Sequence, residues 1–79
     1  MEESQIYTKL AIIFEDVFDD DSIRVSPELT AKDVDGWDSL AHIRLMLAVE
    51  KAFGVKFSNS EINKLQSVGE LVELIRARA

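Results

Sequence analysis

The stretch DGWDSLAHIRLMLAVEKAFG, residues 35–54, has the pattern of a helix together with signals for its start and its end. Asp38 suits an N-cap, because its short carboxylate can accept a hydrogen bond from a backbone N–H of the first helical turn. Ser39 then lies in that first turn, and Gly54 suits the left-handed residue at which helices commonly end. The stretch therefore predicts a helix from Ser39 to about Phe53, with a serine hydroxyl exposed near its start.

This predicted helix has two faces of different character. At about 100° per residue, a broad arc suited to a core contains Ile43, Leu45, Met46, Val49 and Phe53. A separate sector contains Leu40, Ala41, Arg44, Leu47, Ala48 and Lys51. Leucines that face water beside charged groups fit a docking surface for a partner that handles Ser39, and equally fit the scattered apolar residues of ordinary surfaces. We call Leu40, Arg44, Leu47 and Lys51 the docking strip.

The segment before this helix predicts another helix and a long loop. One apolar stripe at helical spacing, over roughly residues 3–18, contains Ile6, Leu10, Ile13, Phe14 and Val17. The polar connection that follows contains the only proline, and Ser26-Pro27-Glu28 suits the capped start of a short turn. Its length indicates a functional loop.

The segment after Gly54 predicts two further helices. Ser58 and Glu61 have capping-box spacing for a helix of one or two turns, and Ser67 and Glu70 repeat that spacing. The last helix is expected to turn inward the residues Val68, Leu71, Leu74 and Ile75. The chain is therefore predicted to be all-α, a four-helix bundle with a short third helix and a long loop between helices one and two.

Composition excludes several classes of protein. Seventy-nine residues, 47% of them hydrophobic, fit a single domain over residues 1–79 and are too few to enclose a large catalytic cleft, so we do not expect an enzyme. The absence of cysteine excludes disulfides and thiolate metal sites or nucleophiles. An acidic N-terminus and the lack of a long apolar run argue against a signal peptide and membrane insertion. We expect a cytoplasmic, monomeric, stand-alone protein.

The net charge of −6 is unevenly distributed. Residues 1–38 hold eleven acids and three bases, whereas residues 39–79 hold four acids and six bases. The bases form no cluster of the kind that binds nucleic acids or anionic membranes, so neither is an expected partner. The acidic runs also lack the glycine and glutamate spacing of a calcium-binding loop, and no metal site is expected.

The segment DGWDSLAHIRLMLAVEKAFGVKFS, and more loosely the whole chain, resembles the acyl carrier proteins. Their hallmark is Asp-Ser-Leu at the start of the second helix of a four-helix bundle, here Asp38-Ser39-Leu40. The resemblance implies that Ser39 bears 4′-phosphopantetheine, which a magnesium-dependent phosphopantetheinyl transferase installs from coenzyme A. It also implies acyl-loading and acyl-processing enzymes as partners in fatty-acid, polyketide or specialised lipid synthesis, and a core that can part to admit an acyl chain.

The same residues permit other interpretations. A catalytic Ser39 would need a general base, and the sole histidine, His42, has neither a G-x-S-x-G context nor an enclosing cleft, so we interpret it as a helix-surface or core-edge residue. Trp37 is interpreted as packing over the end of the bundle. An aminoacyl or peptidyl carrier and an unmodified helical interaction module remain alternatives to the acyl carrier.

The second helix departs from carriers of primary fatty-acid synthesis, which typically present a strongly acidic second helix to basic enzymes. Here Arg44 and Lys51 face outward, and Glu50 is the only acid after Asp38 in that helix. This departure favours a specialised carrier whose partner enzymes match a surface of mixed charge.

Overall fold

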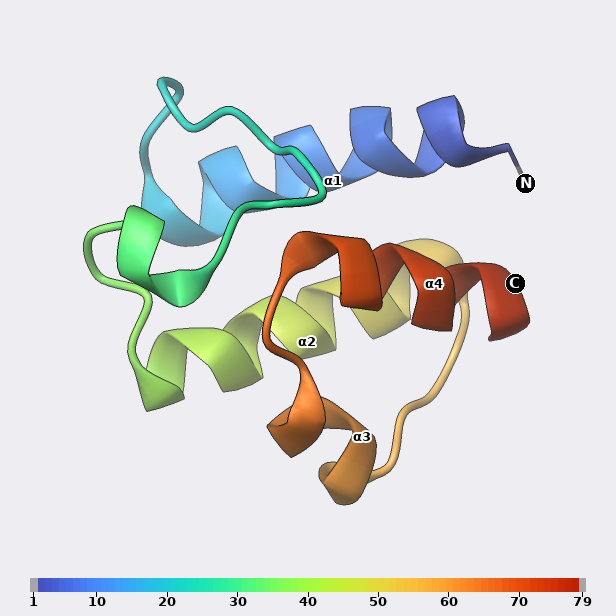
Figure 1. Ribbon diagram of the computed structural model, residues 1–79. Coiled ribbons are helices and arrows are strands. Elements are labelled where there is room, and N and C mark those ends of the chain that lie inside the picture. Colours follow the sequence, from blue (N-terminus) through green and yellow to red (C-terminus); the bar gives the residue numbers. More distant parts are fainter. Residues whose placement is uncertain (1, 79) are drawn as a thin grey trace.

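The computed structural model describes residues 2–78, which form four α-helices, one short 3₁₀ helix and no strand (Figure 1). The elements are α1 (Glu3–Phe18), η1 (Ala31–Asp33), α2 (Ser39–Phe53), α3 (Asn59–Lys64) and α4 (Val68–Arg78). Met1 and Ala79, the ends of the expected 1–79 domain, lie outside the described residues. The predicted four-helix architecture, with its short third helix and its long loop after the first, is confirmed.

The predicted boundaries of α2 and α3 are confirmed by their caps. Gly54 ends α2 in the left-handed region, with φ 67°. At the start of α3 the Ser58 hydroxyl accepts from the Glu61 N–H at 3.1 Å, and the Glu61 carboxylate accepts from the Ser58 N–H at 2.8 Å. These two bonds form the expected capping box.

The start of α4 differs in detail from the predicted capping box. The Ser67 hydroxyl accepts from the Glu70 N–H at 3.4 Å, as expected. The Glu70 carboxylate, however, accepts from the Gln66 N–H at 3.3 Å. Of the two hydrogen bonds of the predicted capping box, only the one to the Ser67 hydroxyl is therefore present.

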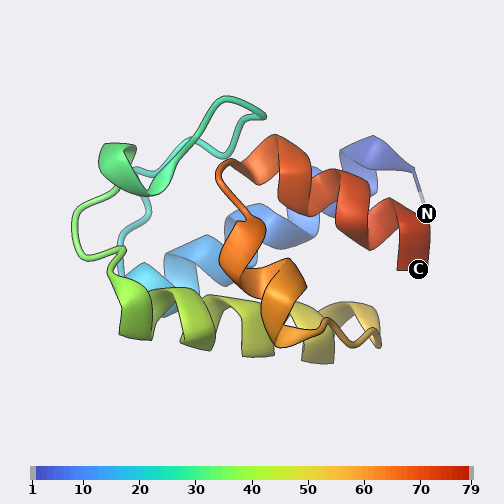
Figure 2. The same ribbon diagram turned by 60° about the horizontal axis from the view of Figure 1, so that its bottom comes forward.

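The core is a single cluster in which the apolar faces of α1, α2 and α4 meet. Figure 2 shows α4 lying over α1 and α2, with α3 crossing beside them. The buried residues of the three long helices are Ile6, Leu10, Ile13, Phe14, Leu45, Met46, Val49, Val68, Leu71, Val72 and Ile75. Val55 and Phe57 add to the core from the connection between α2 and α3. Burial of this apolar surface is the main force holding the helices together.

Ile43 corrects the predicted interior arc of α2. Its side chain is 53% exposed, whereas Leu45, Met46 and Val49 of the same arc are buried. The physical reason is the shortness of α3, which has six residues and leaves a cavity along the first half of α2, and Ile43 lines that cavity. Phe53, at the other end of the arc, is half-buried.

Two smaller corrections concern α1 and α4. Val17 and Leu74, which were expected to face inward, are half-buried at the edge of the core. Val72, which was not among the expected inward residues, is buried. The inward face of α4 is therefore wider than its predicted stripe.

The long loop between α1 and α2 is fastened to the start of α4, which no sequence signal predicted. The N–H groups of Val68 and Gly69 donate to the carbonyls of Leu29 and Pro27 at 2.9 and 3.0 Å. A side chain at Gly69 would lie 3.1 Å from the Pro27 carbonyl oxygen, so glycine permits this close approach. The turn expected at Ser26-Pro27-Glu28 is present, since the Leu29 N–H donates to the Ser26 carbonyl at 3.1 Å, and it does not continue into a helix.

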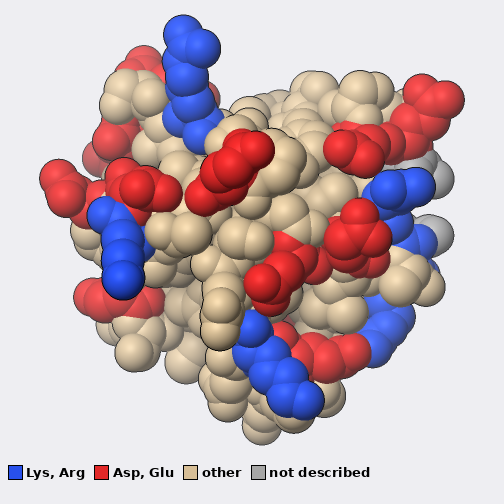
Figure 3. All heavy atoms as spheres, in the orientation of Figure 1, with Lys and Arg blue, Asp and Glu red and all other residues tan. Residues whose placement is uncertain are grey.

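The surface reflects the uneven charge of the sequence. In Figure 3 several acidic side chains lie on the side of the loop after α1, others lie across the middle and the right of the view, and the basic side chains are scattered without forming a broad basic area. Within residues 2–78, no helix combines the length and the apolar character needed to cross a membrane.

Candidate functional site

Ser39 is the first residue of α2, and its side chain is exposed. Asp38 caps the helix as predicted, since its Oδ1 accepts from the Ala41 N–H at 2.8 Å and its carbonyl accepts from the His42 N–H at 2.9 Å. The N–H groups of Ser39 and Leu40 have no carbonyl within the helix to accept their hydrogen bonds. A helix start of this kind favours an anionic group beside the Ser39 hydroxyl.

The residues before Ser39 form a tight turn that turns the chain into α2. Gly36 has φ 86°, a conformation that residues with a side chain rarely adopt. The Trp37 N–H donates to the Val34 carbonyl at 3.3 Å, and the Asp38 N–H donates to the Gly36 carbonyl at 3.0 Å. Before this turn, η1 is capped by Thr30 and Asp33, which form a capping box that was not predicted. The approach to Ser39 is thus held by backbone hydrogen bonds.

Trp37 anchors this turn against α1. Its ring packs edge-on against Phe14, with ring centroids 5.4 Å apart, and at a tilt against Phe18, with centroids 5.8 Å apart. Pairs of this geometry add to the stabilisation that comes from burial alone. The interpretation of Trp37 as a residue that packs over the end of the bundle is confirmed.

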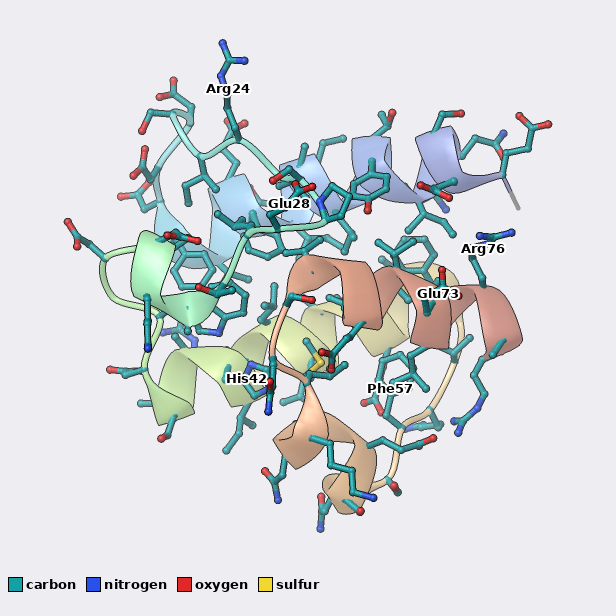
Figure 4. The ribbon with its side chains drawn as sticks, in the orientation of Figure 1. Arg24, Glu28, His42, Phe57, Glu73 and Arg76 are labelled. Carbon is teal, nitrogen blue, oxygen red and sulfur yellow. The ribbon has the colours of Figure 1, made fainter. Side chains whose placement is uncertain are left out.

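His42 lies at the edge of the core and connects three segments. Its Nδ1 accepts from the Trp37 indole N–H at 3.1 Å, and its Nε2 lies 2.9 Å from the carbonyl oxygen of Ile62 in α3. Figure 4 shows its ring on α2 beside the segment that leads from α3 to α4. The interpretation of His42 as a core-edge residue is confirmed, and both ring nitrogens are engaged away from the Ser39 hydroxyl.

A cavity of about 450 Å³ opens beside Ser39, between α2, α3 and the start of α4. Its apolar part is formed by Trp37, Ile43, Met46, Leu65, Val68 and Leu71. Its polar part includes Asp38, Ser39, His42, Asn63, Gln66 and Ser67. The cavity therefore offers a serine hydroxyl at its rim and an apolar interior, an arrangement suited to a ligand with one polar and one hydrocarbon end.

The predicted docking strip lies on the exposed face of α2. Leu40 and Leu47 are 65% and 60% exposed, and Arg44 and Lys51 are exposed as well. Ile43 joins the same face, so three large apolar side chains at spacings of three and four residues stand in water near Ser39. Ile43 connects the docking strip to the cavity, because it lies on the exposed face of α2 and also lines the cavity.

Comparisons with known proteins agree with this geometry. A family model described as the phosphopantetheine attachment site matches residues 8–75. The acyl carrier protein of Lactobacillus johnsonii is 30% identical over 77 residues, covering 98% of this chain and 96% of that protein. The acyl carrier protein of Thermosynechococcus vestitus is 34% identical over 76 residues, covering 95% and 93%. These relatives match along almost their whole length.

A solved structure is similar in both sequence and fold. The solution structure of a holo acyl carrier protein from Geobacter metallireducens superposes with a TM-score of 0.85 at 42% identity. The match covers 91% of this chain and 83% of that one.

Proposed function

The chain belongs to the acyl carrier protein family, and we propose that Ser39 is the residue that bears its 4′-phosphopantetheine arm. The arm, when bound, supplies a terminal thiol for holding acyl units as thioesters, a group that this cysteine-free chain lacks. The observation that supports Ser39 most strongly is an exposed hydroxyl on the first residue of α2, capped by Asp38 and open to a cavity. Catalysis is assigned to the partner enzymes.

The residues around Ser39 suit the phosphodiester end of such an arm. The free N–H groups of Ser39 and Leu40 and the positive end of the α2 dipole stabilise a negative charge at this position. Asp38 keeps the helix start fixed through the Ala41 N–H, so the hydroxyl is presented in one arrangement. The cavity floor of Met46, Val68 and Leu71 suits the hydrocarbon part of an acyl group.

The site assignment predicts which serine is modified. Incubation with coenzyme A, magnesium and a broad-specificity phosphopantetheinyl transferase should add one arm to the wild type and none to Ser39→Ala. The alanine variant should stay folded, because an exposed first-turn hydroxyl contributes little to stability and alanine is a good helix former. Intact-mass spectrometry measures the mass that the arm adds to each protein.

Ser60→Ala is the matched control, because Ser60 is also an exposed serine in the first turn of a helix. It should gain the arm as the wild type does. A Ser39→Ala protein that still gains the mass would overturn the assignment. A wild type that never gains it would favour the unmodified interaction module.

Partner enzymes are proposed to dock on the strip of Leu40, Arg44, Leu47 and Lys51, with Ile43 as an added contact. The leucines supply apolar contact beside Ser39, and Arg44 and Lys51 supply positive charge on a chain whose net charge is −6. A surface of this kind fits an enzyme that places an acid opposite Arg44, and it repels enzymes with basic carrier-binding patches. We therefore propose a specialised acyl carrier rather than a general carrier of fatty-acid synthesis.

The charge of the docking strip predicts partner choice. Arg44→Glu should weaken acyl transfer with the dedicated partner and improve transfer with general fatty-acid enzymes. The effect should be about 0.2 to 1 kcal/mol, as for an exposed ion pair, and it should shrink as salt is raised. Rates of acyl transfer onto the holo protein, measured with both enzyme sets over a range of ionic strengths, test this.

Leu47→Ala is the comparison variant for Arg44→Glu. It should weaken both kinds of partner, because apolar contact does not depend on the sign of a charge. If Arg44→Glu leaves the ratio between the two enzyme sets unchanged at low salt, the specialised-carrier proposal fails.

A further inference from the structure

The only tryptophan and the only histidine of the chain are hydrogen-bonded to each other beside Ser39. Trp37 lies two residues before Ser39, and His42 lies three residues after it on α2. The planes of the two rings are inclined by only 25°, and their centroids lie 6.1 Å apart. The two hydrogen-bonded rings therefore lie on either side of the proposed attachment residue in the sequence.

The partners of His42 determine where its proton lies. The Trp37 indole can only donate a hydrogen bond, so the His42 Nδ1 must accept it and carry no proton. The Ile62 carbonyl can only accept, so the His42 Nε2 must carry the proton and donate it. Both contacts exist together only when the imidazole is neutral and in the Nε2–H form.

Protonation of His42 removes one of these contacts and retains the other. A proton on Nδ1 faces the indole N–H, so the bond to Trp37 is replaced by two opposed donors. The bond from Nε2 to the Ile62 carbonyl persists, because it is strengthened by positive charge. Protonation therefore separates the turn before α2 from His42 while leaving His42 attached to α3.

We propose that neutral His42 is a positioning residue, which holds the Trp37 turn, the start of α2 and α3 in the arrangement that presents Ser39. This inference rests on the proposed function of Ser39. His42 acts through its neighbours: Trp37 precedes the capping residue Asp38, and Ile62 lies in α3, beside the cavity-lining Asn63. Release of Trp37 loosens the turn that delivers Asp38 and Ser39 to the start of the helix.

The other groups that face His42 and the cavity are, with one exception, uncharged. Asp38 is the one carboxylate among the described cavity-lining residues, and it is engaged with the Ala41 N–H. The cavity-lining residues that come from the other elements are uncharged. They are Ala31 of η1, Asn63 of α3, Leu65, Gln66 and Ser67 of the α3–α4 connection, and Val68 and Leu71 of α4. From α1, Phe14 and Phe18 pack on the Trp37 ring. Asp35 and Lys64 are exposed and do not line the cavity. Histidine ordinarily changes charge between about pH 5 and 8, so this range is the window for the test.

Two variants separate positioning from simple packing. His42→Gln supplies an amide with both an acceptor and a donor and does not titrate, whereas His42→Ala removes both contacts. Trp37 fluorescence of the unmodified protein, followed from pH 8 to pH 5, should change in the wild type and remain constant in His42→Gln. Because the chain has one tryptophan, the signal has one source.

The functional readout is the rate at which the transferase adds the arm to Ser39. The ratio of the wild-type rate to the His42→Gln rate cancels the pH dependence of the transferase itself. This ratio should be near one at pH 8 and should fall about 2- to 10-fold toward pH 5.5, the range expected for one neutral hydrogen bond. His42→Ala should be slow at both ends of the range.

The outcomes distinguish this inference from the proposed function. A rate ratio that does not change with pH, or a His42→Ala rate equal to that of the wild type at pH 8, overturns the role of His42. If the transferase adds no arm to the wild type at pH 8, the Ser39 assignment is wrong. The fluorescence titration of the unmodified protein then still tests whether the protonation of His42 changes the surroundings of Trp37.

Discussion

At the scale of single residues, Leu45 and Phe53 contribute differently to the core although they lie on the same helix. Leu45 is fully buried within α2. Phe53 is half-buried near the end of α2, and the ammonium of Lys9 lies 5.2 Å from the centre of its ring. Removal of the Leu45 side chain therefore leaves an enclosed void, whereas removal of the Phe53 ring leaves a space that water can enter.

This difference predicts the order of two destabilisations. Leu45→Ala should lower the free energy of unfolding by about 2 to 5 kcal/mol, as for an enclosed cavity. Phe53→Ala should lower it by about 1 to 2 kcal/mol, because only part of the ring is removed from water. Denaturant titration of the two variants measures both values. A Phe53→Ala protein that is the less stable of the two would contradict the observed packing.

Residues with a local signature were predictable, and those that depend on distant contacts were not. The role of Asp38 as a cap follows from its own side chain and the next few residues. The bond from His42 to the Ile62 carbonyl spans twenty residues, and a backbone carbonyl has no sequence signature. The exposure of Ile43 likewise depends on how much of α2 the short α3 covers.

At the scale of elements, α3 depends on its capping box because six residues are too few for a stable helix in isolation. The Ser58 N–H, with the Arg78 guanidinium also contributing, holds the pKa of Glu61 below its ordinary value near 4.5. A lowered pKa means that the ionised cap stabilises the fold above pH 4.5, and that this contribution is lost as the pH falls through the lowered value.

The capping of α3 therefore predicts a local acid transition. The amide proton shift of Ser58, followed by NMR from pH 6 to pH 2, should titrate with a midpoint below 4.5 in the wild type. Glu61→Gln should abolish that transition while keeping the cap, because glutamine also serves in a capping box. A midpoint at or above 4.5 would contradict the hydrogen bond as the cause.

The elements themselves were largely predictable, since apolar spacing and caps are local signals. The short η1 and the fastening of the loop to α4 were missed. The bonds from Val68 and Gly69 to the Leu29 and Pro27 carbonyls join segments about forty residues apart, and they form only once the bundle brings those segments together.

At the scale of the whole molecule, three features meet at the first half of α2. Ser39 lies at its start, the cavity opens along one side, and the docking strip covers the exposed side. The long loop between α1 and α2, which is rich in acidic residues, leads into the same end of α2 (Figure 1). This arrangement allows a partner of the proposed kind to contact the strip, the cavity and the proposed arm on Ser39 at once.

The most direct test of Ser39 as the attachment residue is localisation of the arm on the intact chain. Holo protein, prepared with coenzyme A and a phosphopantetheinyl transferase, is fragmented in a mass spectrometer, and the fragments that carry the added mass are mapped onto the sequence. The exposed Ser39 at the start of α2 predicts that every fragment with the added mass contains Ser39. Fragments that end just before or begin just after this residue should lack the added mass. Added mass on any other serine would contradict Ser39 as the attachment residue.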